Sequence, residues 1–352
     1  MRRFSFGDFC ARPLLVSLLA LGLVACRHSP HASRRQPPAG VGPSAPGSAL
    51  WVPNAGLGSS PGWIDIYRIR GGSPSLRERL AAPVGIDSPR QVTFSSSRAW
   101  IVNLSSPASV NGGLGSVLGL PLPGKPGAAL HLTRHIDHPY AAALSPSGHL
   151  WVANFNSPAA INDGLGDVAE FVKRRGRWRW RRNLTRGVSD PGALAFDPSG
   201  NLWVLDFYAV AGQSDLGGAT EFLDHSGHIR SDPARQITQG VSNPTDLAFD
   251  PSGNLWISNF YLETPGNTGD LVEYPSVAGR VAAKPSRTIQ GIFDYPTGLA
   301  FDASGNLWVS NYFSHSPSRF GSVVELPPPY RQIAQSISGA SVVRPVELAA
   351  GP

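Results

Sequence analysis

The chain has 352 residues and a formal net charge of +6 at pH 7. Seven positive charges fall within Lys173–Arg182 (KRRGRWRWRR), so the remainder of the chain nets −1, that is 6 − 7. The basic character is therefore local. Together with the absence of a recognition motif in the sequence, this argues against a nucleic-acid-binding protein.

The first 25 residues have the pattern of an export signal. Arg2 and Arg3 precede an apolar stretch, Pro13–Val24, and the sequence Leu-Val-Ala-Cys ends at Cys26. This pattern predicts a bacterial lipoprotein signal that is cleaved before Cys26, whose thiol and amine are then lipidated. The alternatives are an ordinary secretory signal or a membrane anchor, but the apolar stretch is too short to span a bilayer. In lipoproteins of Gram-negative type, a residue other than Asp directly after the lipidated cysteine favours transport to the outer membrane. This chain has Arg27 at that position, so the expected location is the bacterial cell envelope, on the outer membrane.

Residues 26–48 are rich in Pro, Gly and Ser and have almost nothing to bury. We expect a disordered tether here. Lipidation would occupy Cys26, and the only other cysteine, Cys10, would leave with the signal, so the mature chain is not expected to form an intrachain disulfide.

Residues 49–350 contain a repeat whose most regular copy is Pro244–Tyr274. Each copy of the repeat has one tryptophan at the same position: Trp51, Trp100, Trp151, Trp203, Trp256 and Trp308. Successive tryptophans are 49, 51, 52, 53 and 52 residues apart. A steady period of this size indicates an array or a propeller.

Each copy is expected to form four antiparallel strands. Leu-Ala-Phe suits a strand buried on both faces, and Asp-Pro-Ser-Gly has the residues of a type I turn. Asn-Leu-Trp-Val then begins a second strand. A long loop, a third strand such as Gly321–Leu326 and a short polar fourth strand complete the copy. Four strands per period of about fifty residues predict a propeller blade.

Six second strands are present, but only five first strands precede them. The copy at Leu50 lacks its first strand, and Arg344–Ala350 (RPVELAA) at the C-terminus supplies the matching pattern. We therefore predict an all-β, six-bladed propeller whose ring is closed by the C-terminal strand, which removes free sheet edges. The predicted blades are Ala49–Ile86 with Ser341–Ala350, then 87–136, 137–187, 188–240, 241–291 and 292–340.

The pattern P-x-x-L-A-F-D-x-x-G-N-L-W-V-x-N resembles the repeats of NHL and SMP-30/gluconolactonase-like six-bladed propellers. Its Gly-x-Leu-Trp core is also similar to the streptogramin lyase repeat. The resemblance covers about Leu50 to Ala350 and implies the fold. It does not imply one activity, because this architecture carries enzymes, sensors and binding scaffolds.

One face of the ring is the expected ligand face, because long loops follow each second strand there. These loops begin with Asn or Asp, often next to an aromatic residue. The candidates are Asn54, Asn103, Asn154, Phe155, Asp206, Phe207, Asn259, Phe260, Asn311 and Tyr312. The alternative is structural: Asn and Asp can close turns through side-chain to backbone bonds, and the aromatic rings can pack between blades.

The resemblance to SMP-30-like lactonases also implies a divalent cation at the channel mouth, held by carboxylate and Asn side chains. At the matching positions this chain has carboxylates only at Asp246 and Glu347, and the family's full set is missing. Calcium takes six to eight oxygen ligands. No cofactor is therefore expected, and calcium in the central channel remains the alternative.

The basic segment is expected to be the hairpin between the third and fourth strands of the third blade. Arg177, Arg179 and Arg181 alternate with Trp178 and Trp180, which predicts one basic and one aromatic strand face. The segment could protect a sheet edge, or it could contact anionic lipid or another polyanion.

The sequence thus favours a lipid-anchored envelope propeller that binds a protein, peptide or glycan without catalysis. The alternative is a metal-dependent hydrolase or lyase of the SMP-30-like class that uses Asp246 and Glu347. A third hypothesis is a structural assembly factor held at the membrane.

Overall fold

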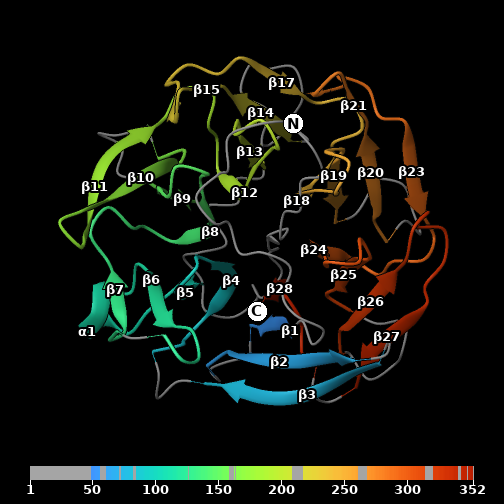
Figure 1. Ribbon diagram of the computed structural model, residues 1–352, viewed down its shortest axis with the longest axis horizontal. Coiled ribbons are helices and arrows are strands. Elements are labelled where there is room, and N and C mark those ends of the chain that lie inside the picture. Colours follow the sequence, from blue (N-terminus) through green and yellow to red (C-terminus); the bar gives the residue numbers. More distant parts are fainter. Residues whose placement is uncertain are drawn as a thin grey trace, which may run out of the picture.

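The computed structural model describes residues 49–55, 61–70, 73–81, 85–125, 127–157, 162, 164–207, 217–260, 268–313, 320–339, 342–346 and 348–351. Six four-stranded antiparallel sheets surround a central axis, as Figure 1 shows. The predicted six-bladed β-propeller is confirmed. The predicted signal peptide and tether, residues 1–48, lie outside the described residues, and none of the helices within those residues is long and apolar enough to cross a membrane.

Each blade runs from an inner strand beside the axis to an outer strand at the rim. Blade 1 contains β28 (Ala349–Gly351), β1 (Ala49–Asn54), β2 (Trp63–Arg70) and β3 (Ser73–Leu80). Blade 2 contains β4 (Pro89–Phe94), β5 (Arg98–Asn103), β6 (Ser116–Pro121) and β7 (Leu130–Leu132), with α1 (Ala108–Asn111) between β5 and β6. Blade 3 contains β8 (Pro139–Leu144), β9 (Leu150–Asn154), β10 (Asp167–Arg174) and β11 (Arg177–Leu184).

The remaining blades follow the same order. Blade 4 contains β12 (Pro191–Phe196), β13 (Leu202–Asp206), β14 (Gly218–Phe222) and β17 (Arg235–Ile237). Blade 5 contains β18 (Pro244–Phe249), β19 (Leu255–Asn259), β20 (Asp270–Tyr274) and β23 (Arg287–Gln290). Blade 6 contains β24 (Pro296–Phe301), β25 (Leu307–Asn311), β26 (Ser322–Leu326) and β27 (Gln335–Ser338). Two small hairpins lie outside these sheets: β15 (Asp224–His225) with β16 (His228–Ile229), and β21 (Ser276–Val277) with β22 (Arg280–Val281).

The C-terminal strand closes the ring, as predicted. β28 pairs with β1 through Ala49 with Gly351 and Trp51 with Ala349, and Figure 1 shows these first and last strands side by side. The N–H of Val346 also donates to the carbonyl of Pro53 at 3.0 Å. Blade 1 therefore has a complete sheet made from both ends of the propeller.

The hairpins between inner and second strands have the predicted turn chemistry. In blade 4 the N–H of Gly200 donates to the carbonyl of Asp197 at 3.0 Å, and Gly200 has a φ of 93°. A residue without Cβ adopts this left-handed conformation without strain. Blades 5 and 6 repeat the turn, so these hairpins form one face of the ring, which we call the hairpin face.

The core lies between neighbouring sheets. Trp203 of blade 4 packs edge-on against Phe249 of blade 5, and Trp256 of blade 5 packs the same way against Phe301 of blade 6, each pair at 6.2 Å between ring centroids. Both indoles are fully buried. A ring that buries about 150–250 Å² gains at most about 4–6 kcal/mol at ~25 cal/mol per Å². The recurring tryptophan thus contributes to the contact between neighbouring blades.

Candidate functional site

The second strands end together at the face opposite the hairpins, which we call the asparagine face. Six polar residues end these strands, and all are at most 3% exposed: Asn54, Asn103, Asn154, Asp206, Asn259 and Asn311. In each, Oδ1 accepts a backbone N–H at 2.9–3.2 Å from the segment that leads into the inner strand of the same blade. These side chains hold that segment against the second strand, which is the structural role that the sequence left open.

The amide nitrogens of this ring have protein acceptors too. Nδ2 of Asn154 donates to the carbonyl of His135 at 3.0 Å and to Oδ1 of Asp167 at 2.9 Å. Asn259 likewise donates to Asp270 at 2.7 Å. The amides of Asn154 and Asn259 therefore help to hold this end of the blades together.

The aromatic residues beside the ring pack between blades. Phe155, Phe207, Phe260 and Tyr312 are each at most 7% exposed. Phe155 of blade 3 stacks on Tyr140 at 4.5 Å and meets Phe207 of blade 4 edge-on at 5.6 Å. These three rings form one cluster with Val346 of the closing segment. Side chains from blades on several sides of the axis thus meet at this end of the channel.

Two arginines lie over tyrosine rings at this end of the channel. The guanidinium of Arg90 lies 4.0 Å from the ring centroid of Tyr140, and that of Arg344 lies 5.6 Å from the ring of Tyr312. Burial raises the pKa of Tyr312, and the charges of Arg344 and Arg90 oppose that rise. The charges of both cations thus act on the Tyr312 hydroxyl, although they come from blades 1 and 2 and the tyrosine comes from blade 6.

Asp246 was predicted as a metal ligand, but its carboxylate is bound by the protein backbone. It is fully buried, with Oδ1 accepting the N–H of Leu247 at 2.7 Å and Oδ2 accepting the N–H of Leu299 at 2.8 Å. It thereby joins the inner strands of blades 5 and 6. Glu347 lies outside the described residues, and among the described ones no three His, Cys, Asp or Glu side chains could hold a metal together.

The basic hairpin lies where the sequence predicts it, between β10 and β11. Trp178 packs edge-on against Trp100 of blade 2 at 5.1 Å, and Trp180 stacks on His135 at 4.1 Å while staying 42% exposed. Arg177 and Arg179 are exposed. The aromatic face of the strand thus contacts blade 2.

Arg181 does not follow this pattern. A β-bulge between Glu170 and Phe171 shifts the register of β10 against β11. As a result Arg181 and Arg182 both reach Glu170, at 2.9 and 2.6 Å. Burial alone would raise the pKa of Glu170, but Arg182, with Arg181 and His149, holds it below its usual value. Arg181 therefore has a partner within the protein.

Glu170 belongs to a polar cluster that is repeated in several blades. In blade 5, Asp250 accepts the backbone N–H groups of Ser252 and Asn254, the Asn254 amide at 2.8 Å and the Trp256 indole at 3.3 Å. Arg287 then binds Glu273 and lies 4.9 Å from the Trp256 ring. Blade 4 repeats this cluster from Asp197 to Arg235.

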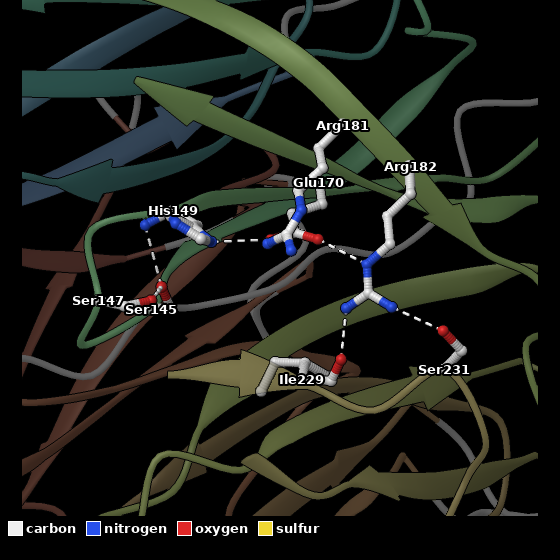
Figure 2. Close-up of polar contacts among 8 residues, drawn as sticks. All are labelled: Ser145, Ser147, His149, Glu170, Arg181, Arg182, Ile229 and Ser231. Atoms are coloured by element: carbon white, nitrogen blue, oxygen red, sulfur yellow. Dashed lines mark hydrogen bonds and ion pairs between the residues drawn. The ribbon is translucent and has the colours of Figure 1, made fainter. Parts of the chain in front are cut away.

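Blade 3 departs from the repeat at two positions, with Ser145 in place of the aspartate and His149 in place of the asparagine. Figure 2 shows Glu170 between His149 and Arg182, with the guanidinium of Arg181 beside the same carboxylate. Nδ1 of His149 lies 2.7 Å from Glu170 Oε1, and Arg182 continues to Ser231 in blade 4 at 2.6 Å. A pocket of about 140 Å³ opens beside this cluster, between the hairpins of blades 3 and 4.

Sequence reasoning missed both the arginine pair and this cluster. Arg90 follows the proline that opens an inner strand, and Arg344 precedes one, so alignment of the repeats could have found them. The glutamates of the third strands recur with the tryptophan period, as Glu170, Glu221, Glu273 and Glu325. The change from Asp-Pro-Ser-Gly-Asn to Ser145-Pro-Ser-Gly-His149 was also visible in the sequence.

Solved structures share this architecture. A chain of a nidogen–laminin complex is similar over 87% of this chain and 98% of its own, with 14% identity and a TM-score of 0.58. A putative 6-phosphogluconolactonase from Bacteroides uniformis is similar over 86% and 99%, with 16% identity and a TM-score of 0.56. These similarities support the β-propeller fold.

A PQQ-bound aldose sugar dehydrogenase from Streptomyces coelicolor is similar over 80% of this chain and 98% of its own, with 14% identity and a TM-score of 0.50. No protein-family model matches this propeller, and no curated protein matches it by sequence. At identities this low, the structural similarity establishes the fold alone. The same fold is shared by proteins with unrelated activities.

Proposed function

We propose that this protein is a lipid-anchored propeller of the bacterial cell envelope that binds an acidic peptide or glycan at its asparagine face without catalysis. The observation that supports the proposal is the position of Arg90 over Tyr140 and of Arg344 over Tyr312 at one end of the channel. Two guanidinium groups with low-dielectric aromatic walls favour a carboxylate over a neutral group.

The position of the pair also supports the proposal. The two arginines lie at the channel end on the face that bears the long loops, and binding residues on a rigid scaffold are most often found at such loops. Arg90 is 6% exposed and held over Tyr140, whereas Arg344 is half-buried. We therefore expect Arg344 to contact the ligand directly. Arg90 should contribute to the positive electrostatic potential around the ligand.

Calorimetric titration with poly-L-glutamate and polygalacturonate tests this function, with neutral dextran as the control polymer. All proteins should carry Arg177→Gln and Arg179→Gln, so that the basic hairpin does not contribute. We expect both acidic polymers to bind, and Arg344→Gln to weaken binding roughly tenfold or more, which corresponds to ~1.4 kcal/mol. Equal affinity with and without Arg344→Gln would contradict the proposal. Arg344→Lys, which keeps the charge, is the matched variant.

The second candidate is the metal-dependent hydrolase or lyase. A putative 6-phosphogluconolactonase has a similar fold, but its likeness supports the fold alone. Calcium calorimetry and lactone hydrolysis with and without chelator distinguish the two candidates. Tight calcium binding and chelator-sensitive turnover, both lost in Asp246→Asn, would favour the enzyme. We expect neither, because both oxygens of Asp246 accept backbone N–H groups.

A further inference from the structure

The tip of the basic hairpin gathers arginine side chains around one hollow. Arg174 ends β10 and Arg177 begins β11. These two residues are cross-strand partners, so their side chains lie on the same face of the hairpin. Arg179 follows Arg177 on that face, because side chains two residues apart in a strand point the same way. A single surface hollow is lined by the four side chains of Arg174, Arg175, Arg177 and Arg179.

The positive charges of this tip have no counter-ion within the described residues. None of the four arginines forms an ion pair there, whereas Arg181 and Arg182 further along β11 both bind Glu170. Arginine is always charged in proteins, and like charges directly opposite each other in a sheet are destabilising. The tip therefore has a concentrated positive potential, which an anion from outside the chain would relieve.

The local fold does not require arginine at this tip. Arg175 has a φ of 48° and the glycine after it 77°, a left-handed pair that most often takes Asn or Gly first. In blade 5, Ala278 and the glycine after it repeat the turn at 51° and 77°, and the only basic residue of that hairpin is Arg280. Protection of the sheet edge does not account for Arg174 and Arg175 either, because neither lies on the outer strand β11.

The opposite face of the hairpin is anchored to the protein. Trp178 packs edge-on against Trp100 of blade 2, with ring centroids 5.1 Å apart, and Trp180 stacks on His135 at 4.1 Å. The indole of Trp180 also donates to Oδ1 of Asn183 at 2.6 Å. These contacts hold the strand in place while the arginines on its other face stay exposed. A ligand of the arginines therefore meets a backbone that is already ordered, which lowers the entropic cost of binding.

A cluster of guanidinium groups suits one kind of anion best. A guanidinium donates two parallel N–H groups to phosphate oxygens. A phosphomonoester carries about −1.5 to −2 charges at pH 7 and has three terminal oxygens, so several guanidinium groups can bind it together. A phosphodiester carries a single charge and has one terminal oxygen fewer. The hollow therefore favours a monoester over a diester.

We propose that Arg174, Arg175, Arg177 and Arg179 form a binding site for a phosphomonoester group. A phosphorylated sugar and the phosphorylated headgroup of a lipid share this chemistry. The site lies at the rim of blade 3, where β11 is the outermost strand (Figure 1). It is independent of the arginine pair on the asparagine face.

Calorimetric titration of the full-length chain with soluble probes at constant ionic strength tests the proposal. Glycerol 3-phosphate is the free phosphomonoester, dihexanoyl phosphatidic acid below its micellar concentration is the lipid monoester, and dihexanoyl phosphatidylglycerol is the diester reference. We expect phosphatidic acid to bind roughly tenfold or more tightly than phosphatidylglycerol, which corresponds to ~1.4 kcal/mol. Equal affinity for the two monoesters would support the site with phosphate as the whole ligand group. Tighter binding of phosphatidic acid than of glycerol 3-phosphate would support it with a lipid headgroup as the ligand.

Arg174→Gln with Arg177→Gln removes the cross-strand pair and should weaken phosphatidic acid binding roughly tenfold or more. Arg174→Lys with Arg177→Lys keeps the charge without the two parallel donors, so it should lose most of the preference for the monoester. Arg280→Gln is the matched control, because Arg280 follows the same turn in blade 5 and pairs with Val277 instead of a second arginine. It should leave the affinity unchanged. No binding of phosphatidic acid, equal affinity for phosphatidic acid and phosphatidylglycerol, or unchanged affinity in the double glutamine variant would overturn the proposal.

Discussion

The backbone N–H of Val343 donates to Oδ1 of Asn54 over 3.0 Å, although the two residues lie 289 positions apart. The same bond joins residues 16 positions apart in blade 2 and 17 positions apart in blades 3 to 6. Ring closure is thus the ordinary bond of the repeat, formed between the two ends of the chain. In blade 1 the C-terminal segment supplies the backbone N–H that a loop of the same blade supplies elsewhere.

Removal of a buried contact in the closing segment should therefore destabilise the whole ring. Leu348 is fully buried in the cluster that joins blades 5, 6 and 1. We expect Leu348→Ala to cost about 2–5 kcal/mol, and deletion of residues 341–352 to cost more, because the hydrogen bonds of β28 are lost as well. Thermal unfolding measures both. Leu76→Ala, on β3 of the same blade at 50% exposure, is the control and should change little; a deletion variant that melts like the intact chain would disprove closure.

The blades could be predicted because their determinants are local: a turn, short apolar strands and a tryptophan that recur along the chain. The closing strand is shorter than predicted, Ala349–Gly351 instead of Arg344–Ala350. Pro345 has no N–H to donate and forms only an isolated bridge with Asn54. Pairing therefore becomes regular only beyond it.

The candidate site was less predictable. An asparagine that contacts a ligand and one that accepts a backbone N–H look alike in sequence, and only the position of the neighbouring loop separates them. The bulge at Glu170 is a second example. Strict alternation places Arg181 with Arg177 and Arg179, but one extra residue turns it toward the buried glutamate.

Lipidation of Cys26 is a prediction of the sequence alone. Mass spectrometry of the mature N-terminus should find a diacyl or triacyl Cys26, because Leu-Val-Ala-Cys follows the apolar stretch. Cys26→Ser should block processing and release the protein from membrane fractions, whereas Cys10→Ser should have no effect. A free N-terminus at another residue would contradict the prediction.

The basic hairpin allows a comparison between arginines of one strand. If it contacts anionic lipid, a soluble form that begins at Arg27 should bind anionic vesicles, and salt should weaken the binding. Arg177→Gln with Arg179→Gln should abolish vesicle binding with little change in melting temperature, since both side chains are exposed.

Arg181→Gln should behave in the opposite way. It removes one of two arginines from the buried carboxylate of Glu170, so we expect a stability loss of about 1–3 kcal/mol and nearly unchanged vesicle binding. Vesicle sedimentation and thermal unfolding separate the two effects. Equal vesicle binding by the wild type and the Arg177 and Arg179 double variant would leave edge protection as the role of the hairpin.

Buried acids near the asparagine face should make stability depend on pH. Burial raises the pKa of Asp167 to about 7, with the Asn154 hydrogen bond opposing and the charge of Asp137 adding to the rise. Burial also raises the pKa of Asp190 to about 6. The folded protein therefore keeps protons that the unfolded chain, with a pKa near 3.8, releases. This contribution is present in full below that value and is lost as pH rises through about 7, so the melting temperature should fall between pH 5 and pH 8.

Asp206 gives the sharpest test of this pH effect. It stands where the other five blades have asparagine, and burial raises its pKa while bonds from the Ser189 N–H and the Thr220 hydroxyl oppose the rise. Asp206→Asn keeps the acceptor for Ser189 and carries no charge. We expect a gain of about 1–2 kcal/mol at pH 8, or ~2–8 °C, and a flatter dependence on pH. Asp232→Asn is the matched control, because its side chain is 70% exposed and should leave the profile unchanged. If Asp206→Asn shifts the melting temperature equally at pH 5 and pH 8, packing rather than ionisation determines the effect.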